Sequence, residues 1–113
     1  MNTVIRLKKR QDFVHLNHNG RKFITKGFVL LALSRGENNP FSDIIRVGFT
    51  TTKKLGKAVI RNRIRRRLRA VAQKVFPVSG QKTYDYILIG RMTTNDCSFE
   101  RLVNDLNFAL EHI

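Results

Sequence analysis

The chain has 113 residues, and its 42% hydrophobic content with only two prolines favours one folded domain over residues 1–113 rather than a disordered chain. Its 22 lysines and arginines against eight acidic residues give a formal net charge of +14, which indicates a polyanionic partner such as nucleic acid. The single cysteine, Cys97, excludes an internal disulfide and a thiolate metal site, and no apolar run approaches the roughly 20 residues that span a bilayer.

The first ten residues form a basic leader without the apolar core of a signal peptide, so we expect a cytoplasmic protein with no membrane partner. Residues 10–18 place Phe13 and Leu16 three apart before Asn19 and Gly20, a pattern that predicts a short helix ended by a glycine.

Two apolar segments then predict strands. Residues 28–33 are apolar at every position and are bracketed by turn-forming residues, and residues 44–52 are rich in β-branched side chains. The loop between them is typical of a hairpin and contains Gly36, Asn38, Asn39 and Pro40.

Helical periodicity begins at Lys57 and should end by Phe76, because Pro77 disfavours the α conformation in the residue before it. Residues 84–90 predict another strand, and apolar residues recur at helical spacing over residues 99–110. A sheet with helices packed on it, in an α+β arrangement, is the fold class that this order predicts.

The strongest feature is a basic segment over residues 53–69 that contains no acidic residue. Its cations are Lys53, Lys54, Lys57, Arg61, Arg63, Arg65, Arg66, Arg67 and Arg69. On a helix, the apolar residues Ile60, Ile64, Leu68, Val71 and Val75 share one stripe about 80° wide, which predicts the face that packs on the sheet. Arg61, Arg65 and Arg69 form one ridge at i, i+4 spacing.

Like charges at this spacing destabilise a free helix, by roughly 1 to 2 kcal/mol for several pairs together. A helix that breaks local rules so consistently is expected where a partner supplies the compensation. Arginine in place of lysine favours bidentate phosphate contacts and stacking on unpaired bases, so structured RNA is the expected partner. Gly56, just before the helix, is compatible with close approach to a phosphate and equally with a simple turn.

The run from Thr52 to Arg69, TKKLGKAVIRNRIRRRLR, closely resembles the signature of the bacterial ribonuclease P protein subunit. Further matches are RLKK at residues 6–9, FVL at 28–30 and RVGF at 46–49. The resemblance implies an accessory subunit of an endoribonuclease that binds the catalytic RNA and helps it remove the 5′ leader from precursor tRNA. It implies Mg²⁺ held mainly by the RNA subunit and substrate, no catalytic or metal-binding residue in the protein, and one protein per RNA.

By position, the resemblance gives an RNA-binding role to Lys53, Lys54, Lys57, Arg61, Asn62, Arg63, Arg65, Arg66 and Arg69. It also implies that a cleft between the first helix and the sheet binds the leader by base stacking on aromatic side chains. We expect Phe13, Phe28, Leu31 and Phe49 to form this cleft, although Leu31 and Asn17 stand where an aromatic residue is frequent. A plain core role for Phe13 and Phe28 is the alternative.

For the fold, the resemblance implies a central mixed β-sheet of about four strands in the order α-β-β-β-α-β-α, with an unusual left-handed βαβ crossover that the general handedness rule does not predict. Two other functions remain to be weighed. An independent nuclease is disfavoured because the acidic residues are scattered and predict no two-metal site. A structural RNA-binding or DNA-binding protein is the alternative that composition alone allows.

Overall fold

The computed structural model describes residues 2–36 and 43–113, which form strands and helices in the order β-α-β-β-β-α-β-α. The strands are β1 (Thr3–Arg6), β2 (Arg21–Ile24), β3 (Phe28–Ser34), β4 (Ile44–Thr50) and β5 (Tyr84–Gly90). The α-helices are α1 (Arg10–Asn19), α2 (Ala58–Ser79) and α3 (Phe99–His112), and two 3₁₀ helices are η1 (Lys53–Leu55) and η2 (Thr94–Asp96).

The strands form one mixed sheet in the order β1-β4-β5-β3-β2. Strand β4 pairs in parallel with β1 and β5, whereas β3 pairs antiparallel with β5 and β2. The α+β class and the mixed sheet are confirmed. The sheet has five strands rather than about four, because residues 3–6 of the basic N-terminal segment add β1 as an edge strand beside β4.

The predicted hairpin between residues 28–33 and 44–52 is wrong. Strand β5 lies between β3 and β4 and pairs with both, so these two strands are not neighbours. Turn-forming residues between two strands indicate that the chain reverses, but they do not determine whether those two strands pair with each other or with a third strand. Of the predicted loop residues, Asn38, Asn39 and Pro40 lie outside the described residues.

Helix α2 connects the parallel strands β4 and β5, as the resemblance implied, and the left-handedness of this crossover stays a prediction. The predicted end of the helix at Phe76 is wrong, since α2 continues through Pro77 to Ser79. Buried Phe76 anchors the last turn to the core, and the backbone N–H of Gly80 donates to its carbonyl oxygen at 2.9 Å. A proline so near the helix end therefore removes one hydrogen bond without ending the helix.

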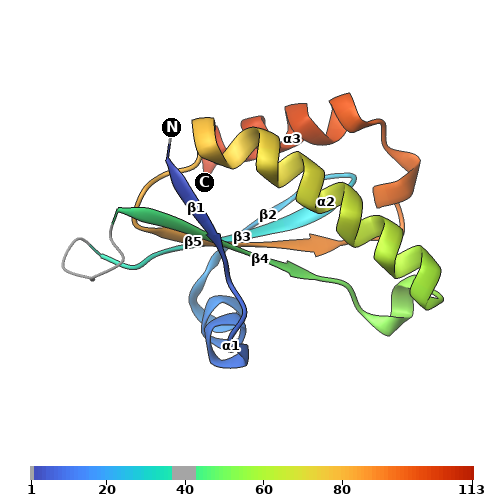
Figure 1. The fold of residues 1–113 in the computed structure, drawn as a ribbon, viewed down its shortest axis with the longest axis horizontal. Helices are drawn as coiled ribbons and strands as arrows, with labels where there is room; N and C mark the ends of the chain where they lie inside the picture. The colour runs from blue at the N-terminus through green and yellow to red at the C-terminus, as the bar shows by residue number, and fades with distance from the viewer. Residues whose placement is uncertain (1, 37–42) are drawn as a thin grey trace.

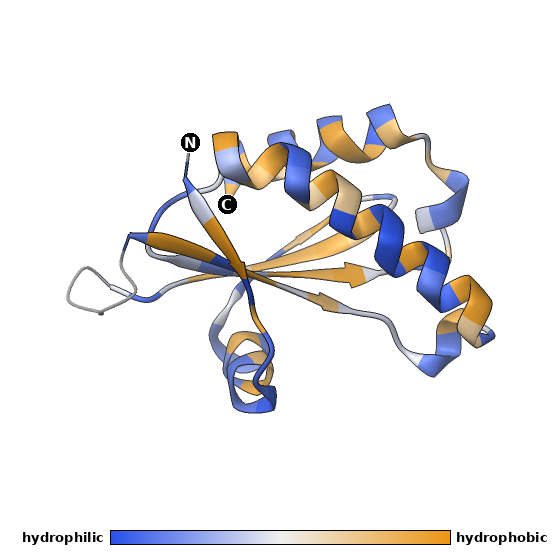
Figure 2. Cartoon of the chain, in the orientation of Figure 1, coloured by the Kyte–Doolittle hydropathy of each residue, from blue (hydrophilic) through white to orange (hydrophobic). Residues whose placement is uncertain are grey.

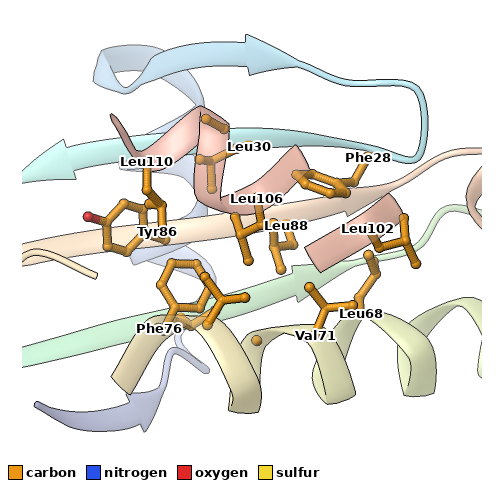
Figure 3. Packing of buried hydrophobic residues seen from close by; sticks show 14 of the residues in the cluster. Phe28, Leu30, Leu68, Val71, Phe76, Tyr86, Leu88, Leu102, Leu106 and Leu110 are labelled. Carbon is orange, nitrogen blue, oxygen red and sulfur yellow. The ribbon is translucent and has the colours of Figure 1, made fainter. Parts of the chain in front are cut away.

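Helices α2 and α3 cover one face of the sheet and α1 covers the other (Figure 1). The main core lies between the sheet and the helices α2 and α3. Its buried side chains include those labelled in Figure 3: Phe28, Leu30, Leu68, Val71, Phe76, Tyr86, Leu88, Leu102, Leu106 and Leu110. Hydrophobic and hydrophilic residues alternate along α2, whereas the central strands are mainly hydrophobic (Figure 2).

The apolar stripe predicted for α2 is largely confirmed. Ile64, Leu68, Val71 and Val75 are at most 2% exposed, but Ile60, near the start of the helix, remains 44% exposed. The buried stripe fixes the rotation of α2 on the sheet, and so decides where each arginine points.

A smaller core lies on the opposite face, under α1. Leu16 from α1 packs there with Leu31 from β3, Ile87 from β5 and Leu7, and Phe13 lies against this group. Because successive side chains of a strand point to opposite faces, β3 and β5 contribute to both cores, whereas β4 contributes Ile45 and Val47 to the main core alone. The sheet thereby separates the surroundings of α1 from those of α2.

Candidate nucleic-acid interface

The basic segment folds as η1 followed by the first half of α2. Its exposed polar and charged residues are Lys53, Lys54, Lys57, Asn62, Arg63 and Arg66, whereas Arg61, Arg65 and Arg69 are half-buried. Among the residues that the structure describes, the ion pairs join Arg35, Arg46 and Arg101 to aspartates, and none involves residues 53–69. The positive charge of this segment therefore has no acidic partner within the described chain.

The predicted ridge of three arginines is present on the side of α2 that faces β4. The Nε of Arg61 donates to the carbonyl oxygen of Gly56 at 3.2 Å. One Nη of Arg65 donates to Thr51 Oγ1 at 2.6 Å. The guanidinium of Arg69 lies 6.0 Å from the ring centroid of Phe49. Each guanidinium is thus held in place by a contact that leaves some of its N–H donors unused.

Gly56 adopts a backbone φ of 120°, which glycine tolerates and other residues rarely adopt. This turn carries the chain from η1 into α2 and aims the Gly56 carbonyl oxygen at Arg61. The turn alternative for this glycine is therefore confirmed, whereas its approach to a phosphate stays a prediction.

Arg67 has a different role from the ridge. Its two Nη atoms donate to the carbonyl oxygens of Thr94, at 2.6 Å, and Cys97, at 2.5 Å. These bonds tie α2 to η2 and the start of α3, on the side of the helix away from the ridge. Composition alone counted Arg67 with the other cations, and only the packing shows that it joins parts of the fold.

Arg69 lies near two other arginines, Arg6 and Arg65, and forms no ion pair with an acidic residue among the described residues. Burial lowers the pKa of Arg69, and the positive charges of Arg6 and Arg65 lower it further. Its Nε is buried and has no hydrogen-bond partner among the described residues, although the side chain as a whole still reaches solvent. Arginine stays protonated in proteins, so this site keeps its charge.

The structure does not bring the four predicted leader-cleft residues together. Phe13 and Leu31 lie on the α1 face of the sheet, where Leu31 is 2% exposed and Phe13 is half-buried. Phe28 is fully buried in the main core. Phe49 lies on the α2 face, beside Arg69. The core alternative therefore holds for Phe28, and Phe13 is the aromatic residue of this set that remains accessible beside α1.

The ring of Phe13 packs directly on the backbone of Gly48. A Cβ atom added at Gly48 would stand 2.6 Å from Phe13 Cζ, closer than carbon atoms approach in proteins. Glycine at this position in β4 thus makes room for the ring between α1 and the sheet.

A charge network around the buried Asp85, which the sequence analysis missed, joins the sheet strands to one another and reaches α1 through Arg46, whose Nη1 lies 3.6 Å from Asp12 Oδ2. Asp85, only 4% exposed, accepts hydrogen bonds from Arg46 at 2.6 and 2.7 Å and from Arg35 at 2.5 Å. The hydrogen bond to Asp85 raises the pKa of Arg46, with smaller contributions from the charges of Asp85 and Asp12 and an opposing effect of burial. An aspartate inside an otherwise apolar strand segment was the available signal.

Within the part of the chain that the structure describes, the acidic, histidine and cysteine side chains are dispersed. No three His, Cys, Asp or Glu side chains among residues 2–36 and 43–113 are grouped so that they could hold one metal ion. In the same part of the chain, the helices are too short or too polar to cross a membrane.

Comparisons with known proteins agree with this fold. Residues 1–113 match the family model described as Ribonuclease P. The chain is 41% identical over 108 residues to the ribonuclease P protein component of Paramagnetospirillum magneticum, covering 96% of this chain and 81% of the relative. It is 45% identical over 108 residues to that of Gluconacetobacter diazotrophicus, covering 93% and 87%.

Two solved structures have the same architecture. The RNase P protein of Staphylococcus aureus superposes with a TM-score of 0.73 at 30% identity, over 94% of this chain and 92% of the other. The RNase P protein of Thermotoga maritima gives 0.75 at 25% identity, over 96% of both chains. The match over the whole chain and the shared fold confirm the resemblance, and the chain belongs to the ribonuclease P protein family.

Proposed function

We propose that this ribonuclease P protein subunit binds the RNA of ribonuclease P through η1 and the exposed face of α2, and helps that RNA to cleave the 5′ leader from precursor tRNA. The observation that carries the proposal is the basic surface of residues 53–69, whose cations have no acidic partner among the described residues. The phosphate backbone of a folded RNA supplies the opposite charge.

The geometry of the ridge supports phosphate binding by arginine in particular. A guanidinium has five N–H donors, and the intramolecular contacts of Arg61 and Arg65 use one and two of them. Both side chains are half-buried rather than buried, so two of the remaining donors can bind one phosphate in a bidentate manner. The same contacts limit the rotamers of these side chains, so less conformational entropy is lost on binding.

In this proposal the RNA carries the chemistry and the protein supplies binding. The described residues do not group as ligands of one metal ion, so no step is assigned to a protein-bound metal. Magnesium ions are held mainly by the RNA subunit and the substrate, in a particle with one protein per RNA. The leader of precursor tRNA lies on the α1 face, where Phe13 is the accessible aromatic side chain.

The test is cleavage of a precursor tRNA by a bacterial ribonuclease P RNA at low magnesium concentration, with and without the protein. We expect the protein to stimulate cleavage and to show no cleavage by itself. Tight RNA binding without stimulation would instead support a structural RNA-binding protein.

A further inference from the structure

A groove of about 530 Å³ lies between the edge strand β1, strand β4 and the C-terminal half of α2. Its volume falls in the range of small-molecule binding sites. Phe49 and Val47 provide an apolar wall, and Arg6, Arg69 and Gln73 add polar groups. None of the described residues that line the groove is acidic. The groove is therefore suited to a flat, partly apolar ligand that carries negative charge.

The groove continues the arginine ridge along the same helix. Arg61, Arg65, Arg69, Gln73 and Pro77 follow one another at i, i+4 spacing, which places them in one row on the surface of α2. Arg69, Gln73 and Pro77 line the groove. An RNA strand that follows the ridge toward the C-terminal end of α2 therefore reaches the groove without leaving the helix surface.

Among the described residues, the side chains of Arg6, Arg69 and Gln73 at the groove form no hydrogen bond or ion pair. The side-chain amide of Asn2, by contrast, donates to the carbonyl oxygen of Gly80 at 2.9 Å. The buried Nε of Arg69 has no acceptor, and its guanidinium lies 6.0 Å from the ring centroid of Phe49. Arg6 and Arg65 lie close enough to Arg69 for their charges to lower its pKa. An anion bound between these arginines would relieve their repulsion and supply the missing acceptor.

We propose that this groove receives an unpaired nucleotide of the ribonuclease P RNA, with its base against Phe49 and its phosphate bound by Arg6 and Arg69. Aromatic rings stack on any base, and unpaired bases are the parts of RNA that such pockets bind. The side-chain amide of Gln73 has both a donor and an acceptor for the edge of the base. This inference rests on the proposed function, because it extends the RNA interface of α2.

The position of the groove selects the source of this nucleotide. Phe13 lies on the α1 face of the sheet, whereas Phe49 lies on the α2 face. A leader bound beside Phe13 is thus separated from the groove by the sheet. The RNA that binds the ridge lies on the same side as the groove, so the RNA subunit is the occupant.

The first experiment uses tryptophan fluorescence, because the chain contains no tryptophan. A Phe49→Trp variant reports stacking in the groove through quenching of its emission when a bacterial ribonuclease P RNA is added. The matched control is Phe108→Trp, which replaces a phenylalanine that is 54% exposed on α3, away from the ridge. We expect quenching for the first variant and none for the second. Quenching of Phe49→Trp by a precursor tRNA alone, with none by the ribonuclease P RNA, would overturn the proposal.

The second experiment measures affinity for the same RNA with Phe49→Leu, which keeps an apolar side chain but removes the ring. Loss of stacking on one base corresponds to an affinity lower by roughly 5- to 150-fold. The dependence of affinity on salt should be unchanged, because no charge is removed. Gln73→Ala should lower the affinity by a smaller factor, since it removes hydrogen bonds to one edge of the base.

The outcomes separate this inference from the proposed function. Wild-type protein that neither binds the RNA nor stimulates cleavage would refute the proposed function. Wild-type protein that does both, while Phe49→Leu and Gln73→Ala bind as tightly as wild type, would refute only the groove. Thermal unfolding followed by circular dichroism shows whether each variant keeps the fold.

Discussion

The sharpest prediction concerns the three ridge arginines. Replacing Arg61, Arg65 and Arg69 together with alanine removes three cations that have no acidic partner among the described residues. Each phosphate that the variant no longer binds should lower the slope of log K against log salt by about 0.7 to 0.9, so the triple variant should have a slope smaller by roughly 2 to 3 units. Between roughly 50 and 200 mM salt, wild-type affinity should therefore fall about 20- to 40-fold more than that of the variant.

The assay is a filter-binding or fluorescence titration of a bacterial ribonuclease P RNA at four or more salt concentrations. Arg67→Ala is the matched control, because it removes one arginine of the same helix whose Nη atoms bond to carbonyl oxygens of the protein. We expect this control to lower the free energy of unfolding by about 1 to 3 kcal/mol and to leave the salt slope almost unchanged.

An equal salt slope for wild type and the triple variant would refute the assignment of the ridge to the RNA interface. The reasoning would also be contradicted if Arg67→Ala changed the salt slope by one third of the change seen for the triple variant. It would mean that the number of cations, and not the side of α2 on which they lie, determines binding.

Three further predictions test the fold around the interface. Asp85→Asn removes the buried negative charge that binds Arg35 and Arg46. The free energy of unfolding, measured by urea denaturation, should fall by about 3 to 5 kcal/mol. Gly48→Ala forces the Phe13 ring to move, so it should cost about 1 to 3 kcal/mol and weaken binding of leader-bearing precursor tRNA more than that of mature tRNA. Burial raises the pKa of Tyr86 to about 12, whereas its value in the unfolded chain is about 10. The stabilisation by the protonated Tyr86 is therefore complete below about pH 10 and is lost as the pH rises through about 12. The free energy of unfolding should be about 1 kcal/mol lower at pH 11 than at pH 9, and the Tyr86→Phe variant should lack this decrease.

The elements that sequence analysis predicted are those whose signal is local. The apolar runs at β3 and β5 and the helical periodicity of α2 and α3 need no knowledge of partners. The residue patterns missed β1 and β2, because each strand has only four residues and contains no fully buried residue. The order implied by the resemblance did include a third strand between the first two helices, where β2 lies. Such edge strands form because a longer strand beside them supplies hydrogen bonds, and that information is not contained in four residues.

The candidate site was predicted in its composition but not in its geometry. The basic segment was evident from its charges, yet its arginines divide between the ridge and the internal bonds of Arg67 only through the rotation of α2 on the sheet. The alternation of β4 predicts that Gly48 and Phe49 point to opposite faces, but not which helix covers which face. That choice separates Phe49 from Phe13, and it depends on the handedness of the connections between strands, which the residues of β4 do not determine.

The structure also explains how a helix with so many like charges can form before RNA is bound. Repulsion between neighbouring arginines costs roughly 1 to 2 kcal/mol. Four fully buried side chains of the stripe, Ile64, Leu68, Val71 and Val75, each contribute about 1.5 to 3 kcal/mol. Burial therefore outweighs repulsion several-fold, and α2 presents its ridge already folded. RNA binding then does not have to order the helix, so the attraction between arginines and phosphates is available for affinity.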